Sequence, residues 1–427
     1  MANQPITHPL TICLSLLLAV AACSPGSRRS EPDPSRSWKA DISEIEGVRI
    51  VSTTDGSVWE GEARLIEEAS IGGVDVDEAY QLLQPSGFSV DLRRQRIGIS
   101  DLRIPAVKIF DFEGNHLFDV GRKGEGPGEY RLIIGMYMDE TDGRIFVHLY
   151  MNHWINIYDA DGTYLDRWRY EMRRGQGAMY FKQSTEGLLR IQHIEQNLAT
   201  NTWIQKVISY NLDGTAVDTL QYPELDFDTP MVESVTGSTV VPFSPYFVSD
   251  INAGGDLVWG YGDSYTLHIC NRSGVEIQAE KYWDKVPVLP GEAAWEKQSV
   301  TEWLRTREPS WDWNGPPVPA HKPAFAFIHA DQSGRIWVQS DGTSTLRSDM
   351  VEATEEELAA EEYSPWHSIP RLDVFDSDGR YLGPVSYSET GVESFYIQYA
   401  RGNVVLAQVN DADDVPSVKR YRLVLPD

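Results

Sequence analysis

The sequence predicts an all-β fold: a six-bladed β-propeller of four-stranded antiparallel blades, closed by an N-terminal strand and carrying two helical or loop insertions. Three observations lead to this prediction: a recurring turn, a constant spacing between paired turns, and an early strand that belongs to no blade of its own. The chain has 427 residues, of which 41% are hydrophobic, so it can bury one large repeat-built core.

A first turn pattern places Asp or Asn, then Gly, ahead of a short β-rich run. Asp and Asn favour the start of tight turns, and Gly tolerates the positive φ that hairpin turns need. An alternating apolar strand precedes the turns, as in VKIFD from Val107 and WINIYD from Trp154. The copies start at Asp111, Asp159, Asn211, Asn271 and Asp376. Each indicates a hairpin between two consecutive strands.

A second turn pattern lies ahead of these hairpins, so that each unit holds two hairpins and four strands. The distance from Gly143 to Gly162 is 19 residues, and the distance from Gly255 to Gly274 is the same. The copies start at Leu92, Glu140, Ser184, Asn252, Asp331 and Tyr399. Six such units predict six blades.

The last unit is short of one strand, because the chain ends at Asp427. Residues 63–73 align with the outer strand at 115–123, since both end in a β-branched residue plus Gly and are soon followed by a tyrosine. We expect residues 63–73 to pair with the C-terminal strand and close the ring. Closure removes sheet edges that would otherwise promote aggregation.

Two insertions interrupt the repeat. Residues 284–322 contain a helical pattern from Gly291 and a loop rich in Pro and Trp, and residues 344–368 are acidic. Aromatic side chains in the first insertion either pack it onto the blades or offer platforms for sugars or peptides. They are Trp295, Trp303, Trp311 and Trp313.

The stretch GRKGEGPGEY, residues 121–130, has the glycine content of a phosphate-binding loop. Such a loop leads into a helix whose N-terminus holds the anion. A strand pattern, LIIGMYMD from Leu132, follows instead, and no Gly-Lys-Ser/Thr ending is present. The stretch is therefore interpreted as a connector between blades.

This connector, the Asp-x-x-Gly-Arg-Ile-x-Val turns and the run KPAFAFIHADQSGRIWV at residues 322–338 carry a resemblance. Over residues 45–427 the chain resembles the bacterial six-bladed β-propeller lipoproteins related to NHL-repeat proteins. The resemblance implies the fold. It implies little about activity, because propellers support many functions.

The N-terminus has the pattern of an export signal. Residues 1–22 include the apolar run LTICLSLLLAVAA, which suits a signal peptide and is short for a membrane-spanning helix. The ending VAAC resembles the lipobox of bacterial lipoproteins, which implies that Cys23 carries lipid; the alternatives are an ordinary secretory signal or a buried apolar segment. Residues 23–40 predict a lipid-anchored flexible tether, and residues 41–427 the propeller.

The expected location is the cell envelope, lipid-anchored in the outer membrane and facing the periplasm or the surface. Ser24 supports this choice of membrane, because an aspartate after the lipid-carrying cysteine commonly signals inner-membrane retention. The formal net charge of −27 opposes contact with phosphate backbones and excludes nucleic acid as a main partner. Cys270 is the single cysteine outside the N-terminal segment, so no internal disulfide is expected.

The loops after the second strand of each propeller blade gather at one mouth of the central channel, where a ligand would bind. The candidate binding residues there are Asp101, His148, His193, Asp263, Asp341 and Asn410. The alternative is that these residues are solvated loop ends. Arg122 and Lys123, with Glu125, are candidate contacts in the connector.

Three functions remain open. The first is a monomeric binding or scaffold module for an envelope protein, a peptide or a saccharide, which touches the membrane only through its lipid. The second is a metal-dependent hydrolase or lyase, because lactonases and peptide amidating lyases share such propellers; a channel Ca²⁺ or Zn²⁺ would be its cofactor, and His148, His193 and His329 its candidate ligands. The third is a purely structural envelope protein. No catalytic residue and no firm cofactor are assigned.

The lipid anchor is tested by Cys23→Ser. Removing the thiol that would carry the lipid should abolish acylation and release the protein from membranes, as measured by fractionation and mass spectrometry of the N-terminus. Unchanged membrane retention of the variant would contradict the lipoprotein interpretation.

Overall fold

The structure is a computed structural model that describes residues 38–426 apart from 150–152, 171–175, 184–186, 198–201, 222–228, 272–273, 348–349, 355–356, 359–363, 389–391 and 412. The signal segment, Cys23 and the tether up to residue 37 lie outside the described residues. The chain is mainly β-strand, as predicted, with a helix α1 (Pro290–Arg305) and a short 3₁₀ helix η1 (Glu78–Tyr80). No helix among the described residues is long and apolar enough to cross a membrane.

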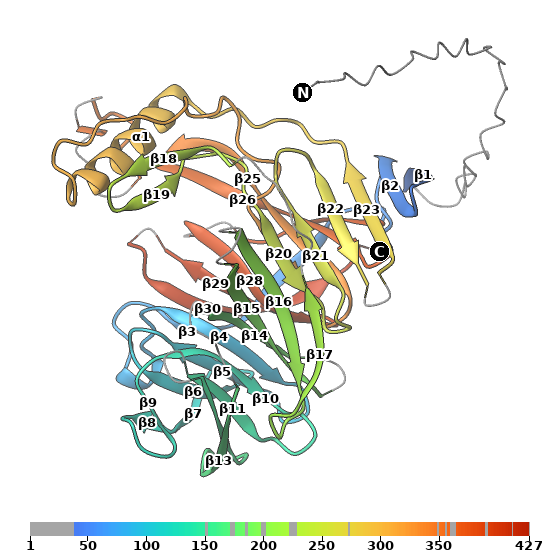
Figure 1. Cartoon of the computed structure of the whole chain (residues 1–427), viewed down its shortest axis with the longest axis vertical. Helices are drawn as coiled ribbons and strands as arrows, with labels where there is room; N and C mark the ends of the chain where they lie inside the picture. Colours follow the sequence, from blue (N-terminus) through green and yellow to red (C-terminus); the bar gives the residue numbers. More distant parts are fainter. Residues whose placement is uncertain are drawn as a thin grey trace, which may run out of the picture.

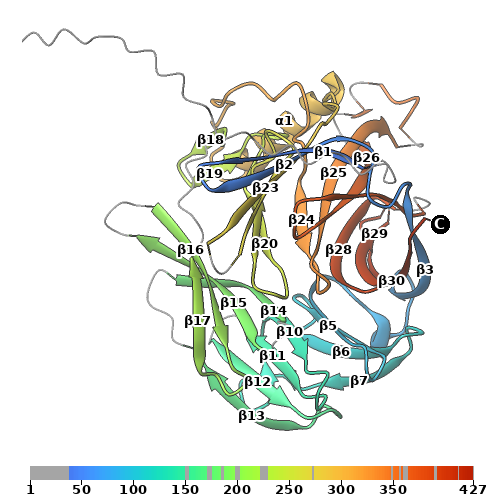
Figure 2. The ribbon, with the colours of Figure 1, turned by 90° about the vertical axis from the view of Figure 1, so that its right-hand side faces the viewer.

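Antiparallel strands follow one another in chain order and form sheets around a common centre (Figures 1 and 2). Three sheets have four strands each: β4 (Pro85–Asp91), β5 (Arg96–Asp101), β6 (Ala106–Asp111) and β7 (His116–Val120); β10 (Ile133–Met138), β11 (Ile145–Leu149), β12 (Trp154–Tyr158) and β13 (Tyr164–Arg169); β14 (Gln176–Gln183), β15 (Leu189–Asn197), β16 (Thr202–Tyr210) and β17 (Ala216–Gln221). This arrangement is that of a β-propeller.

The remaining strands also follow one another in groups, which we call strand runs, but these groups belong to larger sheets. They are β20 (Val248–Ile251), β21 (Leu257–Gly260), β22 (Thr266–Cys270) and β23 (Glu276–Lys281); β24 (Phe327–Ala330), β25 (Arg335–Leu346), β26 (Trp366–Asp376) and β27 (Tyr381–Ser386); and β28 (Ser394–Arg401), β29 (Val404–Asn410) and β30 (Pro416–Val424). The final run has three strands, and its outer position is filled from the other end of the chain.

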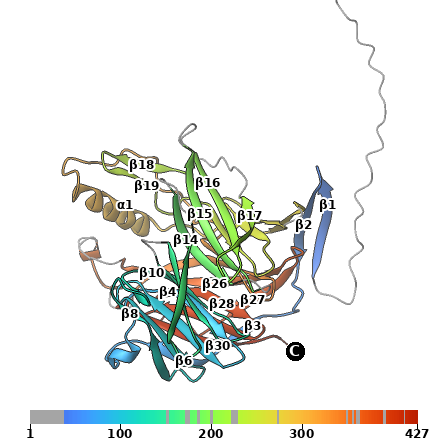
Figure 3. The same cartoon turned by 60° about the horizontal axis from the view of Figure 1, so that its bottom comes forward.

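That outer position is taken by β3 (Ala63–Gly72), which pairs antiparallel with β30 from Arg64–Val424 to Gly72–Ser417. β3 also pairs parallel with β27 through Ala63 and Arg64. Upstream, β1 (Lys39–Ile45) and β2 (Val48–Asp55) form a hairpin, and β2 pairs parallel with β23. The N-terminal segment therefore extends along the outer edges of the last three strand runs (Figure 3), and its hairpin was not predicted from the sequence.

Apolar side chains fill the space between neighbouring sheets. Val107 and Ile109 of β6 pack against Met136 and Val147 of the next sheet, and all four are buried. The inner strands approach so closely that a Cβ at Gly87 would lie 2.6 Å from the Cα of Gly135. Position 87 therefore requires glycine.

Helix α1 of the first insertion lies side by side with the hairpin of β18 (Met231–Ser234) and β19 (Gly237–Val240), which precedes the insertion in the chain, and together they form a cap (Figures 1 and 3). Trp311 is buried among Val232, Val241 and Leu304 and donates its indole N–H to the carbonyl of Glu233 at 2.7 Å. Of the two roles considered for these tryptophans, packing and ligand binding, Trp311 therefore has the packing role. Trp303 is 45% exposed on α1.

The second insertion lies at the far ends of β25 and β26, which pair from Ser344–Ser368 to Leu346–Trp366 beyond a bulge. The two strands therefore extend the sheet into the range that the sequence marked as an insertion. Several residues of the acidic run that follows lie outside the described residues.

The stretch at residues 121–130 joins β7 to β10 and contains two short parallel strands, β8 (Arg122–Lys123) and β9 (Glu129–Tyr130). Glu129 accepts hydrogen bonds from the Gly126 amide at 2.9 Å and from Arg122 Nε at 2.8 Å. The buried hydroxyl of Tyr130 donates to the carbonyl of Val120. The polar groups of the stretch bind one another, which is the behaviour of a structural connector.

We predict that truncation through residue 72 destabilises the whole molecule, whereas truncation through residue 46 has little effect. The longer deletion removes β3, exposes the edge of β30 and loses the buried side chains of Leu65 and Ile71, at a cost of about 5 kcal/mol. Thermal unfolding followed by circular dichroism measures the difference. Equal melting temperatures for the two truncations would show that β3 does not stabilise the ring.

Candidate functional site

The strands alternate in direction, so the turn after each second strand and the connection to the next sheet lie at the same end of the sheets. We call this end the connector face. It carries η1, the cap formed by α1 and β18–β19, and the extended ends of β25 and β26 (Figure 1). The opposite face carries the short turns between first and second strands and between third and fourth strands.

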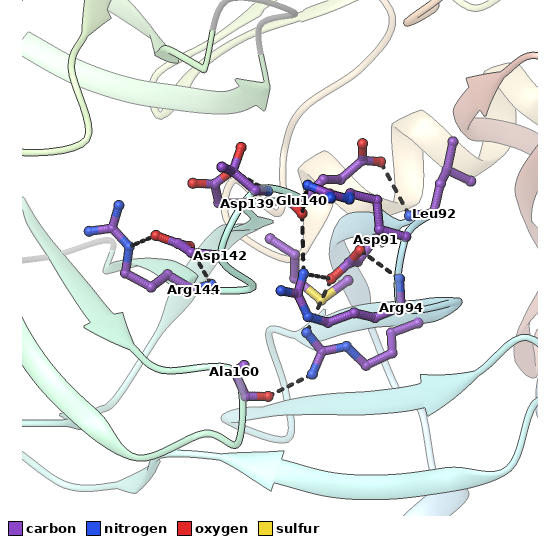
Figure 4. A network of polar contacts seen from close by, with 12 residues as sticks. Asp91, Leu92, Arg94, Asp139, Glu140, Asp142, Arg144 and Ala160 are labelled. Atoms are coloured by element: carbon purple, nitrogen blue, oxygen red, sulfur yellow. Dashed lines mark hydrogen bonds and ion pairs between the residues drawn. The ribbon is translucent and has the colours of Figure 1, made fainter.

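Polar contacts between sheets tie the short turns of the opposite face together (Figure 4). Glu140 accepts from the amide of Leu92 at 3.2 Å and from Arg401 at 2.8 Å, and so joins three strand runs. The Arg96 guanidinium donates to the carbonyl of Ala160 at 2.6 Å and pairs with the buried Asp91. These side chains are occupied by structural contacts.

Two of the predicted mouth residues, His148 and His193, meet in a buried cluster of rings. Both histidines lie edge-on to Tyr170 with ring centroids 5.4 Å away, and His148 Nε2 shares a 2.6 Å hydrogen bond with the Tyr170 hydroxyl. Burial, with smaller effects from His193 and His153, lowers the pKa of His148 to about 3. Burial also raises the pKa of Tyr170, so this pair stays neutral at physiological pH.

His329, the third candidate metal ligand, lies on β24, where its Nδ1 is 3.5 Å from a carboxylate oxygen of Asp250. It lines a central cavity of about 110 Å³ together with Ser89, Gln332 and Tyr399. Across the described part of the chain, no three His, Cys, Asp or Glu side chains lie close enough together to hold a metal ion. Of the three candidate ligands, His148 and His193 lie in the ring cluster around Tyr170, and His329 lies beside the Asp250 carboxylate.

Asp101 and Asn410 lie at one hollow of the connector face. Asp101 accepts four backbone N–H groups, from Leu83 and Gln84 on one oxygen and from Arg103 and Ile104 on the other. Asn410 donates to Asp414 at 2.6 Å. Asn410 lines a basin of about 880 Å³ with Gln81, Gln84, Arg103, Gln408 and Asp414. Asp101 thus shapes the wall of this basin, and Asn410 faces it.

The other predicted contacts are exposed. Asp263 accepts a hydrogen bond from the hydroxyl of Ser264 at 3.2 Å in the turn after β21. Arg122 is paired with Glu129, and Lys123 is exposed beside it. Glu125 pairs with Arg131 at the surface.

Asp341 lies near a buried ion pair that the sequence did not reveal. Lys322 Nζ is 3.1 Å from Glu292 Oε1, and both side chains are at most 5% exposed. Ser344 accepts from Lys322 at 2.7 Å and donates to Glu292 at 2.6 Å. This triad attaches α1 to β25. Burial raises the pKa of Asp341, while the charge of Lys322 opposes the rise.

A second ion pair, partly buried and also missed from the sequence, forms the floor of a cleft of about 650 Å³ between β22–β23 and β26–β27. Lys281 Nζ is 2.8 Å from Asp373, which also accepts hydrogen bonds from the hydroxyls of Tyr265 and Tyr381. No local motif signals this group, since Lys281 lies 92 residues and Tyr265 lies 108 residues before Asp373 in the chain.

The fold and its hollows define the class of protein: a β-propeller with an elaborated connector face. Residues 89–189 match the model of a family described as 6-bladed beta-propeller. No curated protein matches the chain.

Solved structures of low sequence identity are similar to this chain. A member of the duf4221 family from Bacteroides vulgatus is 10% identical, covers 86% of this chain and 99% of its own, and has a TM-score of 0.52. Virginiamycin B lyase from Staphylococcus aureus is also 10% identical over 85% of this chain and 100% of its own, at a TM-score of 0.38. The Bacteroides vulgatus similarity shows the fold alone. The chain is thus a β-propeller similar, in residues 89–189, to the six-bladed family.

The attachment of the cap is tested by Lys322→Met. The variant leaves Glu292 buried without its cation, so we expect a loss of about 3 kcal/mol in the free energy of unfolding, measured in urea. Adding Glu292→Gln should recover part of the loss because it removes the unpaired charge.

The matched control is Lys285→Met, at an exposed position of the same insertion. It should change stability by less than about 0.5 kcal/mol. Equal effects of Lys322→Met and Lys285→Met would show that the buried pair does not hold the cap.

Proposed function

We propose that the protein is a lipid-anchored binding module of the cell envelope. In this proposal the strand runs are six four-stranded blades, β3 closes the ring, Cys23 carries the lipid in the outer membrane, and the monomer presents its connector face to an envelope protein, a peptide or a saccharide. The strand order supports the ring, and the apolar segment before Cys23 supports the anchor.

The difference between the two faces carries the proposal. On the opposite face, short turns bind one another through side chains such as Glu140 and Arg401. On the connector face, longer segments surround hollows of about 880 and 650 Å³. Binding residues concentrate on loops that a rigid scaffold holds in place, so the connector face is the binding face.

The enzyme alternative has less support. It depended on convergent metal ligands in the channel, and in the described part of the chain His148 is hydrogen-bonded to Tyr170 and His329 lies beside Asp250. The acidic surface, with a formal net charge of −27, keeps nucleic acid out of the proposal.

A pair of photo-crosslinking variants tests the proposal in intact cells. A photoreactive amino acid replaces Arg103, which lines the basin on the connector face, or Arg93, an exposed residue in a turn of the opposite face of the same sheet. We expect at least fivefold more crosslinked product from position 103, detected by immunoblot and mass spectrometry. Equal yields from the two positions, or none from either, would overturn the proposal.

A further inference from the structure

The cleft between β22–β23 and β26–β27 combines aromatic rings with a donor and an acceptor at its floor. Asp373 is 9% exposed and accepts hydrogen bonds from Tyr265, Tyr381 and Lys281. Tyr265 and Tyr381 lie under the Lys281 ammonium, with ring centroids 5.3 and 4.1 Å from Nζ. Burial, reinforced by the Asp373 charge, raises the pKa of both tyrosines, so both remain hydrogen-bond donors at physiological pH.

The floor has unused capacity on its cleft side. The Lys281 ammonium has three N–H groups, and its side chain is 24% exposed in the cleft. The Asp373 carboxylate has about four lone-pair sites, of which the three hydrogen bonds occupy three. A donor and an acceptor therefore lie side by side, as two neighbouring hydroxyl groups of a ligand require.

The rim supplies flat apolar surfaces. Tyr282 is 77% exposed, and its hydroxyl is hydrogen-bonded to Asp284, which also raises its pKa. Trp283 is half-buried beside it, and Tyr387 is fixed by stacking on Phe395 at 4.1 Å. Such rings stack on the C–H faces of a ligand at a low cost in side-chain entropy.

Charge in the cleft is nearly balanced. Lys281 and Asp373 neutralise each other. The rim carries one positive charge, on Arg371, and two negative charges, on Glu62 and Asp284. An anion finds no unpaired cation at the floor, and a cation finds no unpaired carboxylate there. An extended peptide strand cannot add to this edge of the sheet, because β27 already pairs with β26 and, at its end, with β3.

We propose that this cleft is a binding site for a neutral saccharide, with a sugar ring on Tyr282 and Trp283 and two of its hydroxyls on Lys281 and Asp373. The inference rests on the proposed function, since it assigns a ligand class to one hollow of the connector face.

The experiment screens the full-length protein, in a detergent without a sugar headgroup, against an array of neutral oligosaccharides built from glucose, galactose, mannose and N-acetylglucosamine. A proline-rich peptide is the comparison ligand. Tryptophan fluorescence then gives the dissociation constant of the tightest binder. We expect Tyr282→Ala to weaken binding at least tenfold and Tyr282→Phe to weaken it less, because the phenyl ring still stacks.

The control is Trp303→Ala, which removes an exposed aromatic side chain from α1 and should leave the dissociation constant unchanged. Three outcomes overturn the inference: no neutral oligosaccharide binds, only the peptide binds, or Tyr282→Ala binds as tightly as the parent. Crosslinking at position 103 separates the two proposals. If it persists while every saccharide fails, the cleft assignment is lost and the connector face stands.

Discussion

Pairing between β3 and β30 joins segments that are far apart in the chain, and the edge of the last sheet depends on it. Lys419 contacts Glu67 across 352 residues at 2.9 Å, and Arg422 reaches Glu68 at 2.6 Å. Without β3, the final run would present an unpaired strand edge. Because β3 also pairs with β27, one strand ties the last two runs together. The core between the sheets is then complete only when both ends of the chain are in place.

The two faces of the sheets use their polar side chains differently. The repeated turns use their polar side chains on their own backbone, as Asp376 does when it accepts from the amides of Asp378 and Arg380. Asp111, Asp159 and Asn271 accept backbone amides in the same way. The connectors are longer, and helix α1, the basin and the aromatic cleft lie among them at the other end of the sheets.

Two ion pairs, one buried and one partly buried, lie on the connector face. Lys322–Glu292 attaches the cap, and Lys281–Asp373 joins β23 to β26. Taking charges out of water is costly, and each pair is supported by further hydrogen bonds, from Ser344 in one case and from two tyrosines in the other. Such pairs fix one arrangement of the joined elements, since any other arrangement leaves a buried charge unpaired.

The sequence by itself determined the all-β class and a helix starting at Gly291, where α1 spans Pro290–Arg305, because turn residues and apolar alternation act over a few neighbouring positions. It also pointed to residues 63–73 as a strand, and β3 is found there beside β30. Only the tertiary structure decided what the site residues contact. Asp101 binds backbone amides, His148 lies against Tyr170, and Lys281 meets Asp373 across 92 residues. The contact between Lys281 and Asp373 depends on how whole sheets pack against one another, and no local pattern encodes it.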